Sequence, residues 1–271
     1  FVMTVGFNYL GKLGQLGNQM FQYAATLGTA RYLGVSFTIP NHNEIFDDGI
    51  GNRLRIELFD CFDIKPDNVG LINSNNILQE NGFQFDSNIF TVDRRNNFTL
   101  YGFFQTEKYF QHCENEIRKQ FTFKKRIVDE CNEIIDDCFD QPVALHIRRG
   151  DFLINSANHY NQSLEYYEKA LSKFDANRQV VIFSDDPAWC MKQDLFDGDR
   201  FLVSEAAGPY HDLYLMTQCH DCIIANSSFS WWGAWLQTNP YQKVIAPKRW
   251  FGPNNAHLNT KDLYCRGWEI V

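Results

Sequence analysis

The sequence lacks the features of nucleic-acid-binding and membrane-spanning proteins. Its 25 basic residues are fewer than its 33 acidic ones, the formal net charge is −8, and no run of five basic residues occurs. An acidic chain without a basic tract is not expected to bind a nucleic-acid backbone. No apolar run reaches the roughly 18 residues that a membrane-spanning helix needs, and the first residues lack the order of a signal peptide. We therefore expect a globular protein with no nucleic-acid partner and no transmembrane segment in this chain.

The sequence also lacks a complete metal-binding motif. Its eight cysteines are scattered, and a chain of 271 residues with 44% hydrophobic content can bury a full core without disulfides. Cys219 and Cys222 have the spacing of a redox or half-zinc motif, but no second cysteine pair completes a zinc site. Asp197-Gly198-Asp199 has a metal-binding pattern, yet it comes just before a predicted strand and fits a surface turn better. We expect no metal site, no required cofactor and mostly buried thiols.

The compartment is inferred from the same absences. Cysteines that look unpaired, a compact start and the lack of an anchor favour a cytoplasmic enzyme of bacterial type. The alternative is a Golgi lumenal domain from which an N-terminal anchor has been removed.

The second half of the chain, residues 141–271, alternates between strand and helix patterns. Apolar strands are predicted at 143–147, 180–183, 201–203, 222–225 and 244–246. Helices are predicted after Ser163, from Pro187, at 212–218 and at 230–237. Continuous apolar strands separated by short helices indicate a parallel sheet covered on both faces. This half is therefore predicted to be a doubly wound α/β domain.

The first half, residues 1–140, has a weaker pattern. A glycine turn at Gly14–Gln19 precedes a helical pattern from Met20 to Leu33. Such a turn presents backbone N–H groups and a positive helix end to an anion, so Gly17 and Asn18 are candidate ligand contacts. Between residues 41 and 135 the periodicity is too weak to order the strands.

Polar clusters directly follow three predicted strands: His146–Arg149, Ser184–Asp186 and Asn226–Ser228. In open α/β sheets, ligands bind outside the carboxyl ends of the strands, so these clusters should converge on one crevice. Arginine suits a compact polyanion such as a diphosphate because its fork stays charged. Side chains of neighbouring residues diverge, so we assign Arg148 to the ligand and Arg149 to a structural ion pair, with Asp151 as a candidate partner. The alternative is a solvated charged turn.

The other two clusters each have two interpretations. Ser227 and Ser228 precede a helix and can offer hydroxyls and N–H groups to a second phosphate, and Phe229 can either wall a base or sugar or belong to the core. Asp185 and Asp186 can accept hydrogen bonds from a base or ribose, or cap the helix that begins at Pro187.

Four segments together resemble one known family. Gly14–Ala24, His146–Asp151, Phe183–Trp189 and Asn226–Leu236 resemble, in order and spacing, the α-1,2-fucosyltransferases of glycosyltransferase family 11. The resemblance runs from Gly14 to Trp268. One departure is that the family's usual double glycine is Gly14-Gln15 here, which affects the first turn.

The resemblance implies a fold and an activity. The fold is GT-B-like, with two Rossmann-like halves facing across a cleft: residues 1–140 on the acceptor side and 141–271 binding the nucleotide sugar. The activity is inverting transfer of L-fucose from GDP-fucose to the 2-hydroxyl of a terminal β-galactoside, without a required metal. The acceptor would be a galactose-terminated oligosaccharide or glycoconjugate. The alternative is a non-catalytic nucleotide-sugar or glycan-binding module.

The resemblance also implies roles for individual residues. Arg148 would pair with the leaving diphosphate, and Asp151 is the first candidate for the proton acceptor, with an ion-pair role as the alternative. The remaining contacts would be His146 to the nucleotide, Gly17 and Asn18 to the phosphate and fucose, Asp185 and Asp186 to the guanosine, and Ser227, Ser228 and Phe229 to the diphosphate and base. The natural acceptor, the base and the oligomeric state stay open.

Overall fold

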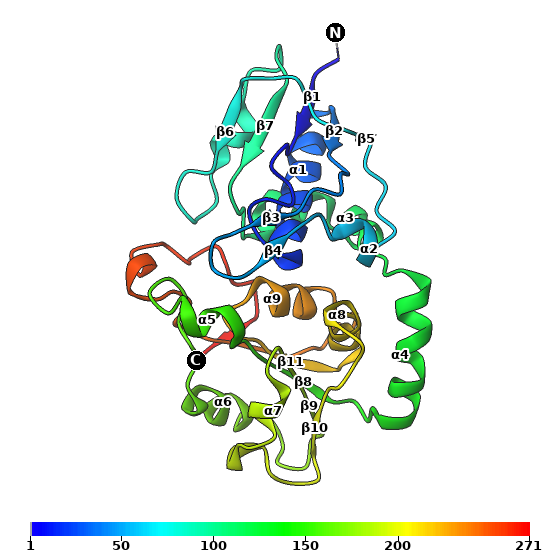
Figure 1. Cartoon of the computed structure of the whole chain (residues 1–271), viewed down its shortest axis with the longest axis vertical. Coiled ribbons are helices and arrows are strands. Elements are labelled where there is room, and N and C mark those ends of the chain that lie inside the picture. Colours follow the sequence, from blue (N-terminus) through cyan, green and yellow to red (C-terminus); the bar gives the residue numbers. More distant parts are fainter. Residues whose placement is uncertain (1) are drawn as a thin grey trace. The chain divides into compact units, whose positions relative to one another are not determined.

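The computed structural model describes residues 2–271, which form two compact units (Figure 1). Unit 1 extends to Lys124 and includes Leu258–Cys265, and unit 2 comprises Lys125–His257 and Arg266–Val271. The chain therefore passes between the units three times. We expected the boundary after residue 140, but the first part of unit 1 ends at Lys124. The difference is helix α4 (Lys125–Cys138), which the structure groups with unit 2. The reason is packing: α4 lies against α8 (Pro209–Gln218) of the same unit.

Unit 1 is built on a five-stranded parallel sheet in the order β5-β2-β1-β7-β6. The bounds are β1 (Thr4–Gly6), β2 (Ser36–Ile39), β5 (Asn68–Val69), β6 (Ile77–Gln79) and β7 (Phe98–Tyr101). A separate antiparallel pair is formed by β3 (Phe46–Asp47) and β4 (Arg53–Leu54). The helices are α1 (Leu16–Leu33), α2 (Leu58–Cys61) and α3 (Glu114–Gln120), with 3₁₀ turns at Ser87–Thr91, Glu107–Tyr109 and Gln111–Cys113.

Helix α1 begins at Leu16, one turn before the predicted start at Met20. It is buried along most of its length, which its alanines and glycines permit by allowing close packing. Gly28 shows how close the packing is, because a Cβ atom there would collide with the carbonyl oxygen of Tyr109. The helix ends at Gly34, whose φ of 70° gives the left-handed cap that glycine adopts without strain.

Unit 2 is a six-stranded parallel sheet in the order β10-β9-β8-β11-β12-β13. Counted along the chain this is 3-2-1-4-5-6, the doubly wound order of dinucleotide-binding folds, and it confirms the predicted fold class. The bounds are β8 (Val143–Ile147), β9 (Val180–Ser184), β10 (Phe201–Val203), β11 (Asp221–Ile223), β12 (Val244–Ala246) and β13 (Glu269–Ile270). The edge strand β13 was not predicted from the sequence.

Helices cover both faces of this sheet: α6 and α7 lie on one face and α8 and α9 on the other (Figure 1). The bounds are α6 (Leu164–Leu171), α7 (Pro187–Cys190) and α9 (Ser228–Trp235). A further short helix, α5 (Gly150–Ile154), follows β8. Val143, Leu145 and Ile147 of β8 pack with the buried side of α6. The alternate residues of a strand point to the opposite face, so His146 points toward the face covered by α8 and α9.

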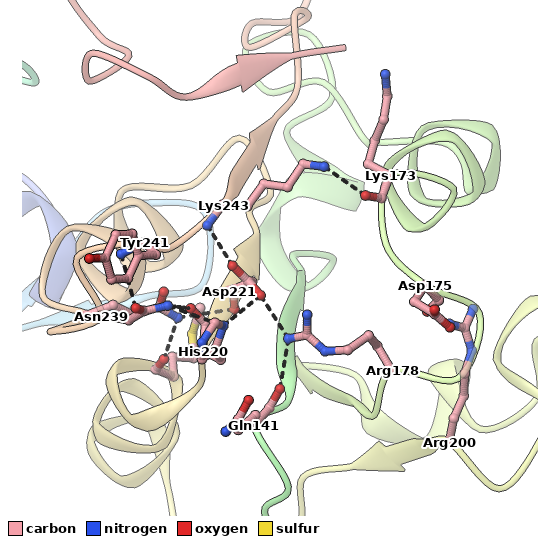
Figure 2. A network of polar contacts seen from close by, with 12 residues as sticks. Gln141, Lys173, Asp175, Arg178, Arg200, His220, Asp221, Asn239, Tyr241 and Lys243 are labelled. Carbon is pink, nitrogen blue, oxygen red and sulfur yellow. Dashed lines mark hydrogen bonds and ion pairs between the residues drawn. The ribbon is translucent and has the colours of Figure 1, made fainter.

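A buried carboxylate ties together the amino ends of the strands of unit 2 (Figure 2). Asp221, at the start of β11, is 4% exposed. It accepts hydrogen bonds from the Lys243 backbone N–H at 2.6 Å and the Arg178 guanidinium at 2.8 Å, and contacts His220 Nδ1 at 3.0 Å. These partners hold the pKa of Asp221 below its usual value against the opposing effect of burial. The network stabilises the amino-terminal ends of the strands, at the opposite end from the predicted ligand site.

Among residues 2–271, no helix is both long and apolar enough to cross a membrane.

Candidate active site

The candidate site of unit 2 lies where the order of its sheet reverses. β8 and β11 are neighbours, and the chain proceeds from β8 to one side of the sheet and from β11 to the other. The carboxyl ends of two such strands leave a crevice, because their connections run to opposite faces. Arg148 follows β8 and the Ser227–Ser228 pair follows β11, so both predicted phosphate contacts lie at this point.

Arg148 is held by two carboxylates. Its Nη2 lies 2.5 Å from Asp151 Oδ1, in the first turn of α5, and its Nη1 lies 3.1 Å from Asp185 Oδ2, after β9. Its guanidinium also lies 5.3 Å from the centre of the Phe152 ring. The side chain remains 21% exposed. A partly exposed arginine fork fixed on two sides is preorganised to meet an anion.

Arg149 points elsewhere, toward α7. Its Nε lies 3.1 Å from Asp186 Oδ2, and its guanidinium stacks 4.0 Å from the Trp189 ring centre. The predicted structural ion pair is therefore present, but Asp151 was the wrong candidate partner. The physical reason is that consecutive side chains diverge at the end of a strand, so Arg148 and Arg149 reach carboxylates on different elements.

The two aspartates after β9 differ in what they bind. Asp186 caps α7 by accepting the Trp189 backbone N–H at 3.1 Å, which is the helix-cap alternative stated above. Asp185 accepts the Arg149 backbone N–H at 2.9 Å and pairs with Arg148. A Cβ atom at Gly150 would collide with Asp185 Oδ2, so this approach depends on the glycine.

His146 is a neutral imidazole in the wall of the site. It is 5% exposed, and burial together with the Arg148 charge lowers its pKa to about 3. Its ring centre lies 5.3 Å from that of Phe229, and its buried Nδ1 has no hydrogen-bond partner among the described residues. An uncharged imidazole beside an aromatic ring suits a heterocycle or a hydroxyl better than a second anionic group.

Helix α9 begins at Ser228, two residues before its predicted start. Ser227 is its cap: its hydroxyl accepts the Phe229 backbone N–H at 3.3 Å, and its carbonyl accepts the Trp231 N–H at 3.0 Å. Ser228 and Phe229 are partly exposed. The start of this helix therefore directs a positive dipole end into the site, with the Ser228 hydroxyl beside it.

In unit 1, Asn18 and Gly17 occupy the first turn of α1, with Asn18 partly exposed and Gly17 buried. The Asn18 Oδ1 accepts a hydrogen bond from Gln105 Nε2 at 2.9 Å, which orients its amide. Gly14 has a φ of 149°, and a Cβ atom there would strike the Asn18 amide. The first glycine of the family motif is thus required here, whereas Gln15, in place of the second, is an exposed helix-cap residue.

Gln105 and Glu80 belong to this arrangement but were missed from the sequence. Glu80, just after β6, accepts the backbone N–H groups of Phe103 and Phe104 at 2.9 and 3.0 Å. Burial raises the pKa of Glu80 to about 7. Phe104 has a φ of 54°, which is unusual for a bulky residue, so the Glu80 bonds hold a strained loop that carries Gln105. A fifth segment of the sequence, Tyr101–Phe110, also resembles the family, and because it contains Gln105 it is the signal that could have led to this residue.

Unit 2 therefore gathers most of the predicted site residues through two connected groups. One is a chain of three ion pairs, Asp151–Arg148, Arg148–Asp185 and Arg149–Asp186, which the hydrogen bond from the Arg149 backbone N–H to Asp185 joins together. The other joins His146, Phe229, Ser227 and the start of α9. Gly17 and Asn18 form a separate arrangement in unit 1.

The described part of the chain contains no group of three or more His, Cys, Asp or Glu side chains placed to hold a metal. Cys219 and Cys222 are both buried, and burial raises the pKa of the Cys219 thiol well above its usual value. Such thiols are poor metal ligands and poor nucleophiles.

Comparisons with known proteins agree with this geometry. The family model described as "Glycosyl transferase family 11" matches residues 5–271. The O-antigen biosynthesis glycosyltransferase WbnK of Escherichia coli is 28% identical, over 93% of this chain and 97% of that protein. An α-1,2-colitosyltransferase of Escherichia coli is 33% identical over 63% and 61%, and human galactoside α-(1,2)-fucosyltransferase 1 is 26% identical over 82% and 63%.

Solved fucosyltransferases share the fold. The α-1,6-fucosyltransferase NodZ, soaked with GDP-fucose, superposes with a TM-score of 0.56 at 14% identity, covering 96% of this chain and 98% of that one. POFUT1 in complex with GDP gives a TM-score of 0.54 at 13% identity, covering 90% and 98%. At these identities the likeness shows the fold, a GT-B-like α/β architecture with two Rossmann-like units.

Proposed function

The chain belongs to glycosyltransferase family 11, and from that membership we propose that it is an inverting α-1,2-fucosyltransferase. It transfers L-fucose from GDP-fucose to the 2-hydroxyl of a terminal β-galactoside. The relatives named for α-1,2 transfer support the linkage, and the solved fucosyltransferases with GDP or GDP-fucose support the donor.

The observation that carries the proposal is that Arg148 and the start of α9 both follow the strands at the switch point, Arg148 after β8 and α9 after β11. A fixed guanidinium and a helix N-terminus are two sources of positive potential for one diphosphate. Their position at the carboxyl ends of the strands is where doubly wound folds bind nucleotides.

The chemical step needs charge relief on the departing GDP. The acceptor 2-hydroxyl attacks the anomeric carbon of fucose as the bond to the diphosphate oxygen breaks, and the hydroxyl proton leaves to a base or to water. Arg148 stabilises the negative charge that develops on the diphosphate, and it does so without reorganising because Asp151 and Asp185 already orient it. We propose that this charge removes the need for a divalent metal.

The remaining residues of unit 2 place the nucleotide. His146 stays neutral at physiological pH and, with Phe229, offers a heteroaromatic and an aromatic surface to the nucleotide. Ser227 and Ser228 receive the diphosphate at the start of α9, and Asp185, with Asp186 at the α7 cap, faces the guanosine and ribose. In unit 1, Gly17 and Asn18 approach the phosphate and fucose.

Asp151 has two roles to separate. The contact with Arg148 supports a positioning role, in which the carboxylate fixes the guanidinium. A proton-acceptor role predicts that Asp151→Asn abolishes turnover while GDP affinity is kept. A positioning role predicts that GDP affinity and turnover fall together.

The test of the activity is incubation with GDP-fucose and lactose, followed by linkage analysis of the product. A 2-linked fucosyl lactose is expected, with activity retained in EDTA. Fucose found only on another hydroxyl would contradict the regiochemistry, and activity lost in EDTA and restored by manganese would contradict the metal-independent step.

Two alternatives are resolved by the same assay. The colitosyltransferase relative makes a nucleotide-activated colitose a necessary comparison donor, and a much higher kcat/KM with that donor would move the assignment to colitosyl transfer. A non-catalytic binding module would show thermal stabilisation by GDP but no GDP release with any galactoside.

A further inference from the structure

Unit 1 contains a cavity of about 390 Å³ that none of the donor-site residues lines. Its walls come from the loop after β1, which carries Asn8, Tyr9 and Lys12, and from loops that carry His42, Glu44 and Leu71. Its volume is in the range of small-molecule sites.

The cavity lies at the carboxyl edge of β1. β1 ends at Gly6, which pairs with Thr99 of β7, and Thr99 pairs in turn with Ile77, the first residue of β6. β6 therefore begins where β1 ends, and this stagger leaves space above β1. The loop that leaves β1 forms a wall of the cavity and then reaches Gly14 and Asn18.

The walls are fixed before any ligand binds. The Asn8 side chain donates to the Ile72 carbonyl at 2.9 Å and accepts the Ile72 N–H at 3.0 Å, which joins the loops after β1 and β5. The Asn8 backbone N–H bonds to the Thr99 hydroxyl at 2.9 Å. The Tyr9 ring packs edge-on against Tyr101, with 5.0 Å between centres, so its orientation is also set.

His42 supplies the observation that points to a ligand. Its Nδ1 accepts the Glu44 backbone N–H at 3.3 Å, which leaves the proton of the neutral ring on Nε2. That Nε2 is buried and has no partner among the described residues, although the ring lines the cavity. A buried donor without a partner is costly. Nε2 has almost no free surface of its own, so a small turn of the ring would bring it to an oxygen atom inside the cavity, which would satisfy it.

The charge in the cavity favours a neutral ligand. Lys12 is the lining cation, and it lies 3.9 Å from Glu44, a lining anion, and 4.4 Å from the centre of the Phe46 ring. The two charges offset each other. Amide, hydroxyl and imidazole groups beside a tyrosine ring and the exposed Leu71 match the hydroxyls and the C–H face of a sugar.

We infer that this cavity is an acceptor subsite, which holds a neutral sugar residue further along the chain than the galactose that receives fucose. The inference rests on the proposed function. Asn18 does not line the cavity, so the cavity is separate from the proposed fucose contact, and the loop after β1 connects the two. An acceptor longer than a disaccharide would therefore gain contacts that lactose cannot make.

The experiment compares kcat/KM for lactose with kcat/KM for lacto-N-tetraose, a neutral tetrasaccharide with a terminal β-galactose. The parent enzyme should prefer the tetrasaccharide. His42→Ala should remove the Nε2 donor and lower kcat/KM for the tetrasaccharide by about tenfold, mostly through KM, as expected for one hydrogen bond. Its kcat/KM for lactose should stay within about twofold of the parent's.

A second variant does not depend on removing a buried group. Leu71 is 65% exposed, so Leu71→Trp should fold and partly fill the cavity mouth, with the same selective loss. Leu202→Trp, on the edge strand β10 of unit 2, is the matched control and should leave both acceptors unaffected.

The outcomes are distinguishable. Equal kcat/KM for the two acceptors in the parent, or equal losses for both in His42→Ala and Leu71→Trp, would overturn the subsite. No transfer to either acceptor by a parent enzyme that GDP stabilises would overturn the proposed function instead.

Discussion

The carboxyl edges of the two parallel sheets are built from different chemistry. In unit 2 the edge is a chain of opposite charges, in which Arg148 and Arg149 alternate with Asp151, Asp185 and Asp186. In unit 1 the edge is mostly neutral: an amide pair joins Asn18 to Gln105, and polar uncharged groups line most of the cavity. Both edges begin from a similar backbone, a short parallel strand followed by a loop and a helix.

The difference indicates how the two edges would divide a transfer reaction. A diphosphate is recognised by fixed charge, and the cost of holding two arginines close together is offset by the carboxylates between them. A glycan is recognised by many weak neutral contacts, which need fixed loops and not strong charge. Replacing Arg148 in unit 2 should therefore cause a larger loss of turnover than any single substitution in unit 1.

The largest expected effect is that of Arg148→Ala. Removing the charge that we propose faces the diphosphate should lower kcat by roughly two to three orders of magnitude, as for other preorganised charge stabilisers. Arg148→Lys should rescue only part of the loss, because an ammonium cannot reproduce the fork. Initial rates of GDP release measure this, and near-parental turnover in Arg148→Ala would show that the central charge has been wrongly assigned.

His146 should make the fold sensitive to acid. Its pKa is about 3 in the folded protein and about 6.5 when unfolded, so the unfolded state binds a proton first as the pH falls. The stability due to neutral His146 is complete above pH 6.5 and is lost as the pH falls toward 3. Between pH 8 and pH 5 the free energy of unfolding should fall by about 2 kcal/mol more in the parent than in His146→Gln.

Urea unfolding at the two pH values measures this difference. His257→Gln is the control, because His257 is exposed and its substitution should leave the pH dependence parental. Parallel pH profiles for the parent and His146→Gln would contradict the prediction.

Arg149→Ala should affect stability more than turnover. It leaves Asp186 without its guanidinium partner and Trp189 without the stacked cation, and we expect a loss of about 1–2 kcal/mol from the free energy of unfolding. Turnover per folded molecule should stay within about threefold, a smaller change than electrostatic stabilisation would give. Arg200→Ala is the matched control. Arg200 also lies over an aromatic ring, that of Phe201, but its hydrogen bond to Asp175 goes to the backbone carbonyl and not to the carboxylate. If Arg149→Ala lost more kcat than Arg148→Ala, Arg149 would be the arginine that meets the diphosphate and Arg148 the structural one.

Compared as free energies, the smallest effect is expected in unit 1. Gln105→Ala frees the Asn18 amide to rotate and should lower kcat about fivefold, which corresponds to about 1 kcal/mol for one neutral hydrogen bond. Thermal stabilisation by GDP should be unchanged. Gln79→Ala, at an exposed position of β6, serves as control. A loss as large as that of Arg148→Ala would remove the contrast between the two edges.

The fold of unit 2 was predictable from the sequence because its strands are continuous apolar runs. Val143–Ile147, Phe201–Val203 and Val244–Ala246 have the predicted bounds. The edge strand β13 escaped notice because it is two residues long and pairs on one side only. In unit 1 the strands are two to four residues long, too short for a period of two to be recognised.

The sequence was enough to predict which residues belong to the candidate site and where they lie in the fold. It was not enough to predict which side chains they contact. Placement after a strand marked Arg148, Asp185 and Ser227, whereas the partner of Arg149 depends on which way a side chain turns after the strand. Glu80 acts through two backbone N–H groups, and no side-chain pattern in the sequence reports such bonds.

The three crossings of the chain between the units have a consequence for folding during synthesis. Asp262, 8% exposed in unit 1, lies 2.5 Å from Lys108 Nζ and accepts the Phe85 backbone N–H, while β13 pairs with β12 in unit 2. Residues 258–271 thus supply parts of both units. The rest of unit 1 has already been translated when synthesis reaches Lys124. Because domains usually fold in order as they leave the ribosome, unit 1 must wait through the translation of unit 2 before its last ion pair can form. Exchanging either unit between relatives would require grafting this segment as well, divided between Cys265 and Arg266.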